Sequence, residues 1–208
     1  MKKVFILLMA LAICDASLNA QRLKETFDSN SLNWNECASE SRQGTSVIDN
    51  GVLTITSKGA KTTMFGYQKR PNTYFTCFCY APLNVQRPFK VSTNVTIQKL
   101  DEDRMVGLIF NYKDDGNFYV FNFNEEEVGF QRFKDFDLVG EIWQSVKWPK
   151  TRKAQQNWRL ESDGSTLNFF VDELPIMSIR YMPLEFAGFG YYTYGKQKLM
   201  VDDIEFIQ

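Results

Sequence analysis

Acidic side chains spaced two apart along a strand are the residues of this sequence with the clearest potential for catalysis. Alternate residues of a strand point to one face, so two such carboxylates can flank a glycosidic bond, one as nucleophile and the other as proton donor. Three acidic clusters approach that spacing: Asp101-Glu102-Asp103, Glu125-Glu126-Glu127 and Asp202-Asp203-Ile204-Glu205. The first two fall in predicted turns, where charge is solvated, and we interpret Asp203 as structural. The sequence thus shows no evident catalytic set and favours a protein that is not an enzyme.

Histidine is absent from the chain, which excludes several kinds of active site. A Ser–His–Asp triad, a histidine general base and a histidine metal ligand are all ruled out. The sequence also contains no Gly-x-Ser-x-Gly nucleophile elbow. We expect no required cofactor.

Aromatic side chains are abundant, with 18 Phe, 9 Tyr and 4 Trp among 208 residues. Sugar rings present apolar faces that pack on Trp and Tyr, while their hydroxyl groups need polar partners nearby. Because Tyr and Trp also carry a polar group, Tyr112, Tyr119 and Trp143 are the candidate ligand-binding residues. The alternative for each is a place in the core.

A basic segment surrounds Trp148. Lys147, Lys150, Arg152 and Lys153 lie within seven residues of one another, with the indole among them. Such a loop can hold an anionic glycan, with Trp148 stacking on the sugar and Lys150 and Arg152 pairing with its carboxylate or sulfate. The alternative is a solvated loop beside a core tryptophan.

Calcium is the ion that suits the remaining oxygen ligands. It takes six to eight of them, often from Asp side chains and backbone carbonyls. Asp28 on the first strand and Asp202 or Asp203 on the last can meet if the terminal strands pair. The alternative is ordinary edge and turn aspartates.

The first twenty residues have the pattern of a secretory leader. Lys2 and Lys3 precede an apolar run over Val4–Ile13, which is too short to span a membrane. Cleavage after Ala20 leaves a mature chain of residues 21–208, secreted, periplasmic or at the cell envelope. In a second interpretation Cys14 is the lipidated cysteine of a degraded lipobox. The leader resembles those of Bacteroidetes-type bacteria, and no other segment is apolar enough to span a membrane.

Three cysteines then remain in the mature chain. Cys77 and Cys79 alternate on one predicted strand, too far apart for a good mutual bridge. An oxidising compartment permits a disulfide from Cys37 to Cys77 or Cys79. The alternative is three buried thiols.

Period-two alternation dominates the sequence and predicts an all-β protein of about twelve to fourteen strands in one domain. Phe89–Ile97 alternates apolar and polar residues throughout, and Asp49-Asn50-Gly51 precedes another alternating run. A meander is predicted over Met105–Phe133, and a hairpin turns at Ser162–Ser165. Helix is expected only as one turn near Lys150–Gln156. The balanced charge, with 24 basic and 25 acidic residues, indicates no nucleic-acid partner.

The order of these features resembles the concanavalin-A-like, laminin-G-like jelly roll of secreted bacterial proteins. The resemblance rests on matching segments spread over most of the mature chain. They are Phe27–Trp34, Asp49–Ile55, Gly107–Tyr112, Asp115–Phe121, Trp158–Leu160, Phe169–Asp172, Gly188–Tyr191 and Val201–Ile204. It implies two antiparallel sheets, and a concave face that often binds or cleaves glycans.

Fold does not fix function, so three classes stay open. The first is a lectin-like carbohydrate-binding protein of the cell envelope or exterior, with a glycan or polysaccharide as partner. The second is a glycoside hydrolase with an unrecognised carboxylate pair. The third is a structural or adhesive envelope protein that binds another protein. The sequence leaves the oligomeric state open.

Overall fold

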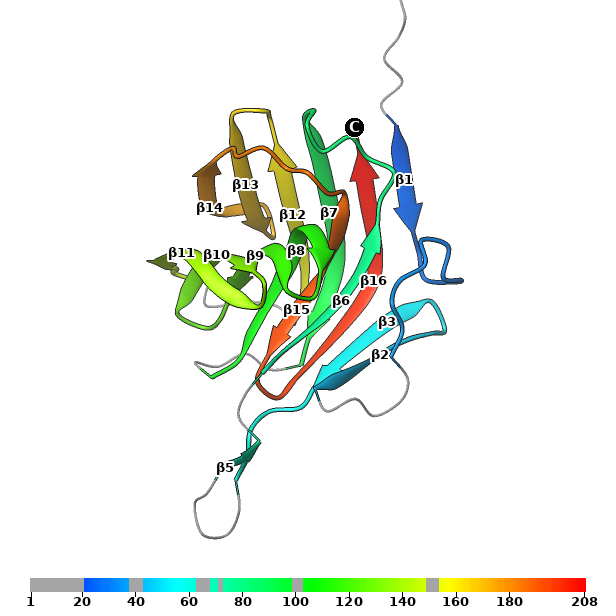
Figure 1. Ribbon diagram of the computed structural model, residues 1–208. Helices are drawn as coiled ribbons and strands as arrows, with labels where there is room; N and C mark the ends of the chain where they lie inside the picture. Colours follow the sequence, from blue (N-terminus) through cyan, green and yellow to red (C-terminus); the bar gives the residue numbers. More distant parts are fainter. Residues whose placement is uncertain (1–20, 38–42, 63–67, 71–72, 99–102, 149–153) are drawn as a thin grey trace, which may run out of the picture.

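The computed structural model describes residues 21–37, 43–62, 68–70, 73–98, 103–148 and 154–208. Within these ranges the chain forms β-strands and no helix. Two antiparallel sheets face each other and form a sandwich, which confirms the predicted fold class (Figure 1). The predicted leader, including Cys14, lies outside the described residues. The described residues also contain no helix long and apolar enough to cross a membrane.

The larger sheet has eight strands, ordered β14-β13-β12-β7-β16-β3-β2, with β1 pairing with β16. These strands are β1 (Arg22–Glu25), β2 (Gly44–Asp49), β3 (Val52–Ser57), β7 (Phe89–Ile97), β12 (Gln155–Ser162), β13 (Thr166–Val171), β14 (Leu174–Arg180) and β16 (Gln197–Ile207). The first and last strands of the chain therefore pair, as expected.

The smaller sheet has six strands in the order β11-β10-β9-β8-β15-β6. They are β6 (Tyr74–Tyr80), β8 (Met105–Asp114), β9 (Asn117–Phe123), β10 (Glu127–Lys134), β11 (Asp137–Ser145) and β15 (Gly188–Tyr194). Strands β8, β9 and β10 form the predicted meander, and β11 extends it beyond the predicted range. Two short strands, β4 (Lys61–Thr62) and β5 (Gln68–Arg70), pair separately.

The prediction of a helical turn near residues 150–156 is wrong for the last two residues of that range. Gln155 and Gln156 already belong to β12, where Gln155 pairs with Thr96 of β7 and Gln156 with Val95. Sheet pairing therefore decides the backbone conformation here. Positions 150–153 lie outside the described residues.

Aromatic side chains join the two sheets in the core. Phe121 of β9 stacks on Phe169 of β13, with ring centroids 5.4 Å apart. Phe123 of β9 meets the edge of Trp158 of β12 at 5.3 Å. All four side chains are fully buried. Alternation along the strands produces this layer, because every second residue of β7, β12 and β13 is buried.

Replacing Phe169 by alanine should lower the free energy of unfolding by about 3–5 kcal/mol, because it removes a stacked ring from a closed core. Urea unfolding followed by tryptophan fluorescence measures this. The matched control is Phe136→Ala, since Phe136 is 69% exposed; it should change stability by no more than about 0.5 kcal/mol. Equal effects of the two substitutions would contradict this description of the core.

Candidate functional site

The six-stranded sheet carries a second apolar layer on its outer face, the face turned away from the larger sheet. Ile109, Val120 and Tyr192 are buried there although no second sheet covers them. Aromatic rings pack over them instead: Phe78 stacks on Tyr112 at 3.9 Å, and Phe118 on Phe133 at 4.7 Å. The outer face is therefore a packed aromatic surface rather than an alternating polar one.

Tyr112 lies within this layer and is only 1% exposed. Its hydroxyl donates to Asp115 Oδ1 at 2.6 Å, and Thr76 Oγ1 donates to the same oxygen at 3.0 Å. Burial, together with the adjacent Asp115 carboxylate, raises the pKa of Tyr112. The structure thus gives Tyr112 a packing position that leaves its ring faces covered.

A polar chain interrupts the aromatic layer near the β11 edge of the sheet. Asn122 Nδ2 donates to Gln131 Oε1 at 2.6 Å, and Gln131 Nε2 donates to Glu141 Oε2 at 3.3 Å. The indole nitrogen of Trp143 donates to the same Glu141 oxygen at 2.7 Å. The chain runs from fully buried Asn122 to exposed Glu141, and Asn122 Oδ1 has no hydrogen-bond partner within the described part of the protein.

Trp143 is held by two contacts and stays partly exposed. Its indole lies directly over Gly129 of β10: a Cβ atom at Gly129 would be 2.5 Å from the ring. Its nitrogen is fixed by Glu141, two residues earlier on the same face of β11. The Oε1 atom of Glu141 accepts no hydrogen bond from any described residue. An aromatic ring with a free carboxylate oxygen beside it can stack on a sugar and accept a bond from its hydroxyl.

Carboxylates are scarce on the outer face. The outward positions from Met105 to Tyr112 on β8 and from Phe118 to Asn122 on β9 carry none. Glu141 of β11 is one, and Glu127 of β10, which alternates with Gly129 and Gln131, is another. Asp115 belongs to the β8–β9 turn, and its Oδ1 atom accepts hydrogen bonds from the hydroxyl groups of Thr76 and Tyr112. Glu127 and Glu141 lie four register positions apart along β10 and β11, which is about 13 Å at ~3.3 Å per residue. This exceeds the separation of about 5–10 Å that a catalytic carboxylate pair needs.

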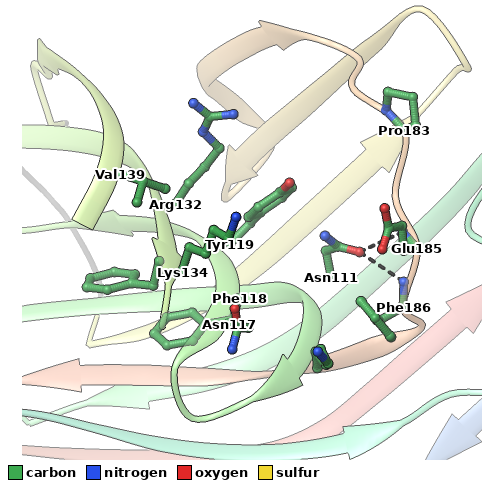
Figure 2. A pocket seen from close by; sticks show the side chains of 12 residues that line it. Asn111, Asn117, Phe118, Tyr119, Arg132, Lys134, Val139, Pro183, Glu185 and Phe186 are labelled. Atoms are coloured by element: carbon green, nitrogen blue, oxygen red, sulfur yellow. Dashed lines mark hydrogen bonds between the residues drawn. The ribbon is translucent and has the colours of Figure 1, made fainter. Parts of the chain in front are cut away.

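A cavity of about 400 Å³ opens at the end of the sandwich where β9 and β10 meet the segment between β14 and β15 (Figure 2). Tyr119 lines it, as do Arg132 and Lys134 from β10 and Lys113 from β8. Asn111 fixes the far wall, because its Oδ1 accepts hydrogen bonds from the backbone nitrogens of Glu185 and Phe186 at 2.8 and 2.9 Å. The cavity is therefore formed by two segments that one side chain holds together.

The structure separates the other predicted ligand-binding residues. Tyr119 lines the cavity, Trp143 lies on the outer face, and Tyr112 is buried. Trp148 packs on Phe123 at 5.1 Å and donates its indole nitrogen to the Asn124 carbonyl at 3.1 Å. Lys150 and Arg152 lie outside the described residues, so their role stays a prediction.

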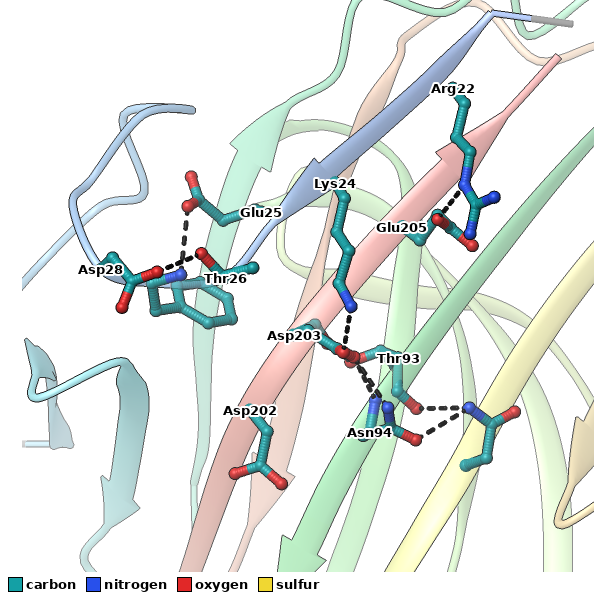
Figure 3. Close-up of polar contacts among 12 residues, drawn as sticks. Arg22, Lys24, Glu25, Thr26, Asp28, Thr93, Asn94, Asp202, Asp203 and Glu205 are labelled. Atoms are coloured by element: carbon teal, nitrogen blue, oxygen red, sulfur yellow. Dashed lines mark hydrogen bonds and ion pairs between the residues drawn. The ribbon is translucent and has the colours of Figure 1, made fainter.

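The three aspartates proposed for calcium have separate partners, and Figure 3 shows those of Asp28 and Asp203. Asp28 accepts a hydrogen bond from Thr26, and Asp202 accepts one from Gln155. Asp203 forms an ion pair with Lys24 at 2.9 Å. The described residues contain no group of three or more acidic or cysteine side chains that could hold a metal ion. Binding of calcium stays a prediction.

The structure does not form the possible disulfide from Cys37 to Cys77 or Cys79. Cys77 and Cys79 face the core from β6, where Cys77 Sγ lies 3.7 Å from the Asn35 carbonyl. Cys37 lies beside Ser46, with which its backbone pairs. Burial raises the pKa of Cys77 to about 12 and raises that of Cys79 as well.

Stability should therefore fall as the pH rises above about 9. The unfolded chain loses its thiol protons near their ordinary pKa of 9.0, whereas folded Cys77 keeps its proton to about 12; the folded state binds more protons in that window, so alkali favours unfolding. Urea unfolding at pH 8 and pH 10.5 measures the slope. Cys77→Ala should flatten it, and an unchanged slope in that variant would contradict the burial of this thiol.

Sequence reasoning missed Asn122, Gln131, Glu141 and Arg132. Asn122 and Gln131 were hidden in runs that alternate as ordinary strands. Glu141 and Trp143 show the spacing of two that places side chains on one face, and this signal could have linked them. Arg132 carried no signal, because the cavity forms only when the segment around Glu185 folds against β9 and β10.

No protein-family model and no curated protein sequence matches the chain. Solved structures do resemble it. The endo-β-1,3-glucanase of Pyrococcus furiosus is 10% identical, with 89% of this chain and 93% of that chain covered and a TM-score of 0.60. The laminarinase catalytic domain of Thermotoga petrophila is 10% identical, with 91% and 98% covered and a TM-score of 0.59. The CBM2 module of the evolved Dit of Lactobacillus casei BL23 phage J-1 is 12% identical, with 90% and 96% covered and a TM-score of 0.55.

The chain has a jelly-roll fold. This agrees with the resemblance to concanavalin-A-like domains, since the similar structures include β-glucanases. At these identities the likeness concerns the fold alone, and these structures include both glucanases and a carbohydrate-binding module. The choice between such roles for this chain depends on its own side chains.

Proposed function

We propose that this protein binds a carbohydrate without cleaving it, through the outer face of the six-stranded sheet around Trp143. The observation that carries the proposal is the indole of Trp143, seated on Gly129 and oriented by Glu141, whose second oxygen is free. A sugar needs an apolar platform and polar groups beside it, and this arrangement supplies both.

The platform is rigid before any ligand binds. Glu141 receives hydrogen bonds from both Gln131 and Trp143, and Gln131 is anchored on buried Asn122. Little side-chain freedom is left for a ligand to remove, so binding costs less ordering entropy. The glycine beneath the ring is part of the design, because any larger residue would lift the indole from the sheet.

The alternative function is hydrolysis of a glycan by a pair of carboxylates. The arrangement of carboxylates on the outer face does not favour it. Glu127, the other carboxylate on this face of β10 and β11, lies four register positions from Glu141, and Glu141 already fixes Trp143. The glucanases that share the fold support a sugar ligand for the jelly roll but carry no residue over to this chain at 7–10% identity. The predicted leader supports a location outside the cytoplasm, where polysaccharides are found.

Binding to another protein is a second candidate, which one patch favours. Phe136, Leu138, Val139 and Ile142 of the β10–β11 hairpin are each 44–69% exposed. Strand β11 also ends the six-stranded sheet, so its outer edge is unpaired within the described residues. An adhesive role would use this patch rather than Trp143.

Trp143→Ala should lower the affinity for a bound glycan by about tenfold or more, because the stacking surface is lost. A glycan and polysaccharide array identifies a ligand, and calorimetry then measures the affinity of each variant. The matched control is Ile142→Ala, the neighbouring residue on the opposite face of β11, which should leave the affinity unchanged.

The same panel tests the alternatives. Release of reducing sugar by the wild-type protein would contradict the non-catalytic proposal. A glycan affinity that falls with Ile142→Ala but not with Trp143→Ala would place binding on the hairpin patch instead. An array without any binding would overturn the glycan proposal within the range of the panel.

A further inference from the structure

The cavity beside Tyr119 is lined by more cationic than anionic side chains, and it is not part of the site around Trp143. We propose that this cavity is a second ligand site, which binds the carboxylate or sulfate group of an acidic sugar. That the ligand is a sugar rests on the proposed function, whereas its negative charge rests on the cavity itself.

Three cations line the cavity and face one carboxylate. Lys113, Arg132 and Lys134 contribute the positive charge, and Glu185 the negative. Within the described part of the chain, none of the three cations forms an ion pair with an acidic side chain; Lys113 instead has its ammonium 6.0 Å from the centre of the Phe186 ring. The lining therefore keeps an excess positive charge, which an anionic ligand would neutralise.

Arg132 can lie flat on the sheet because the residue opposite it, Gly140, has no side chain. Its guanidinium lies against Gly140 of β11, so that a Cβ atom at Gly140 would be 2.7 Å from Nη2. Gly140 pairs with Arg132 across the two strands, and this glycine lets the planar group lie along the sheet. A half-buried guanidinium held in this way can donate two parallel hydrogen bonds to a carboxylate or sulfate.

Neutral donors stand beside the charge. The Tyr119 hydroxyl and the Asn111 side-chain nitrogen form no hydrogen bond with any described residue, although both residues line the cavity. The ring of Tyr119 is held edge-on by Phe110 and Phe130, at 5.8 and 6.0 Å. Figure 2 shows Tyr119 lying between Arg132 and Asn111. The volume of about 400 Å³ falls within the range of small-molecule sites.

The cavity and the platform are separate surfaces. Arg132 pairs with Tyr119, on the face of the sheet where Phe130 enters the core, whereas Trp143 pairs with Gly129 on the outer face. A change in one site should therefore leave the other intact. This separation allows the two proposals to be tested independently.

The test compares charged sugars with their neutral forms by calorimetry on the full chain. The probes are oligogalacturonate with its carboxyl-reduced form, and a sulfated galactan oligosaccharide with its desulfated form. The wild-type protein should bind at least one charged form about tenfold more tightly than its neutral form. Arg132→Gln should abolish this preference, while Arg87→Gln, at an exposed arginine outside the cavity lining, should preserve it.

A second variant covers the case in which Arg132→Gln does not fold. Gly140→Ala keeps every charge but displaces the guanidinium, and it should reduce the preference for the charged form. Equal affinity of the wild-type protein for charged and neutral forms, or a preference that survives both substitutions, would overturn the inference. Neutral sugars bound through Trp143 with no charge preference would leave the proposed function standing. A charge preference that needs Arg132 but not Trp143 would leave only the cavity site.

Discussion

Buried aromatic side chains pack between the two sheets and hold them together. The positions of the residues on the outer face follow from this packing. Phe121 and Phe123 contribute from β9, Trp158 and Phe169 from β12 and β13, and all four are excluded from water. Because strand residues alternate between faces, filling this layer leaves the next residues of β8, β9 and β15 on the outer face. Those positions are also largely apolar, so they pack into a second layer. At Trp143 and Glu141 this second layer ends in polar side chains that solvent can reach.

Asn111 shapes both the aromatic outer layer and the wall of the cavity. Its backbone has a left-handed φ of 50°, and the pairing of β8 with β9 is irregular between Phe110 and Asp114. Phe110 therefore points into the core, while Tyr112, two residues later, joins the outer layer. The side chain of Asn111 also fixes the backbone of Glu185 and Phe186, which forms the far wall of the cavity. One irregular residue thus seals the aromatic surface and shapes the cavity.

The sequence predicts the fold well where burial alternates and the site poorly where it does not. Phe89–Ile97 alternates without interruption, and β7 has that range and burial. Tyr112 was a candidate ligand-binding residue because its ring carries a polar hydroxyl. Nothing in the sequence indicates the left-handed residue before it, after which Tyr112 joins the packed outer layer. Strand β11 was not predicted as a strand, since most of its residues are exposed on both faces. Trp148 and Trp143 look equivalent in sequence; only the contacts with Phe123 and Gly129 show that one packs on the core and the other lies on a glycine.

The most direct test of the central claim uses the four indole N–H signals of the ¹⁵N-labelled protein during titration with a glycan that it binds. Trp34 and Trp158 are buried, and Trp148 donates to the Asn124 carbonyl. The account predicts that the Trp143 signal shifts with the binding isotherm while the signals of Trp34 and Trp158 stay in place, and that the glycan stays intact throughout. Saturation without a shift of the Trp143 signal, or cleavage of the glycan during the titration, would contradict it.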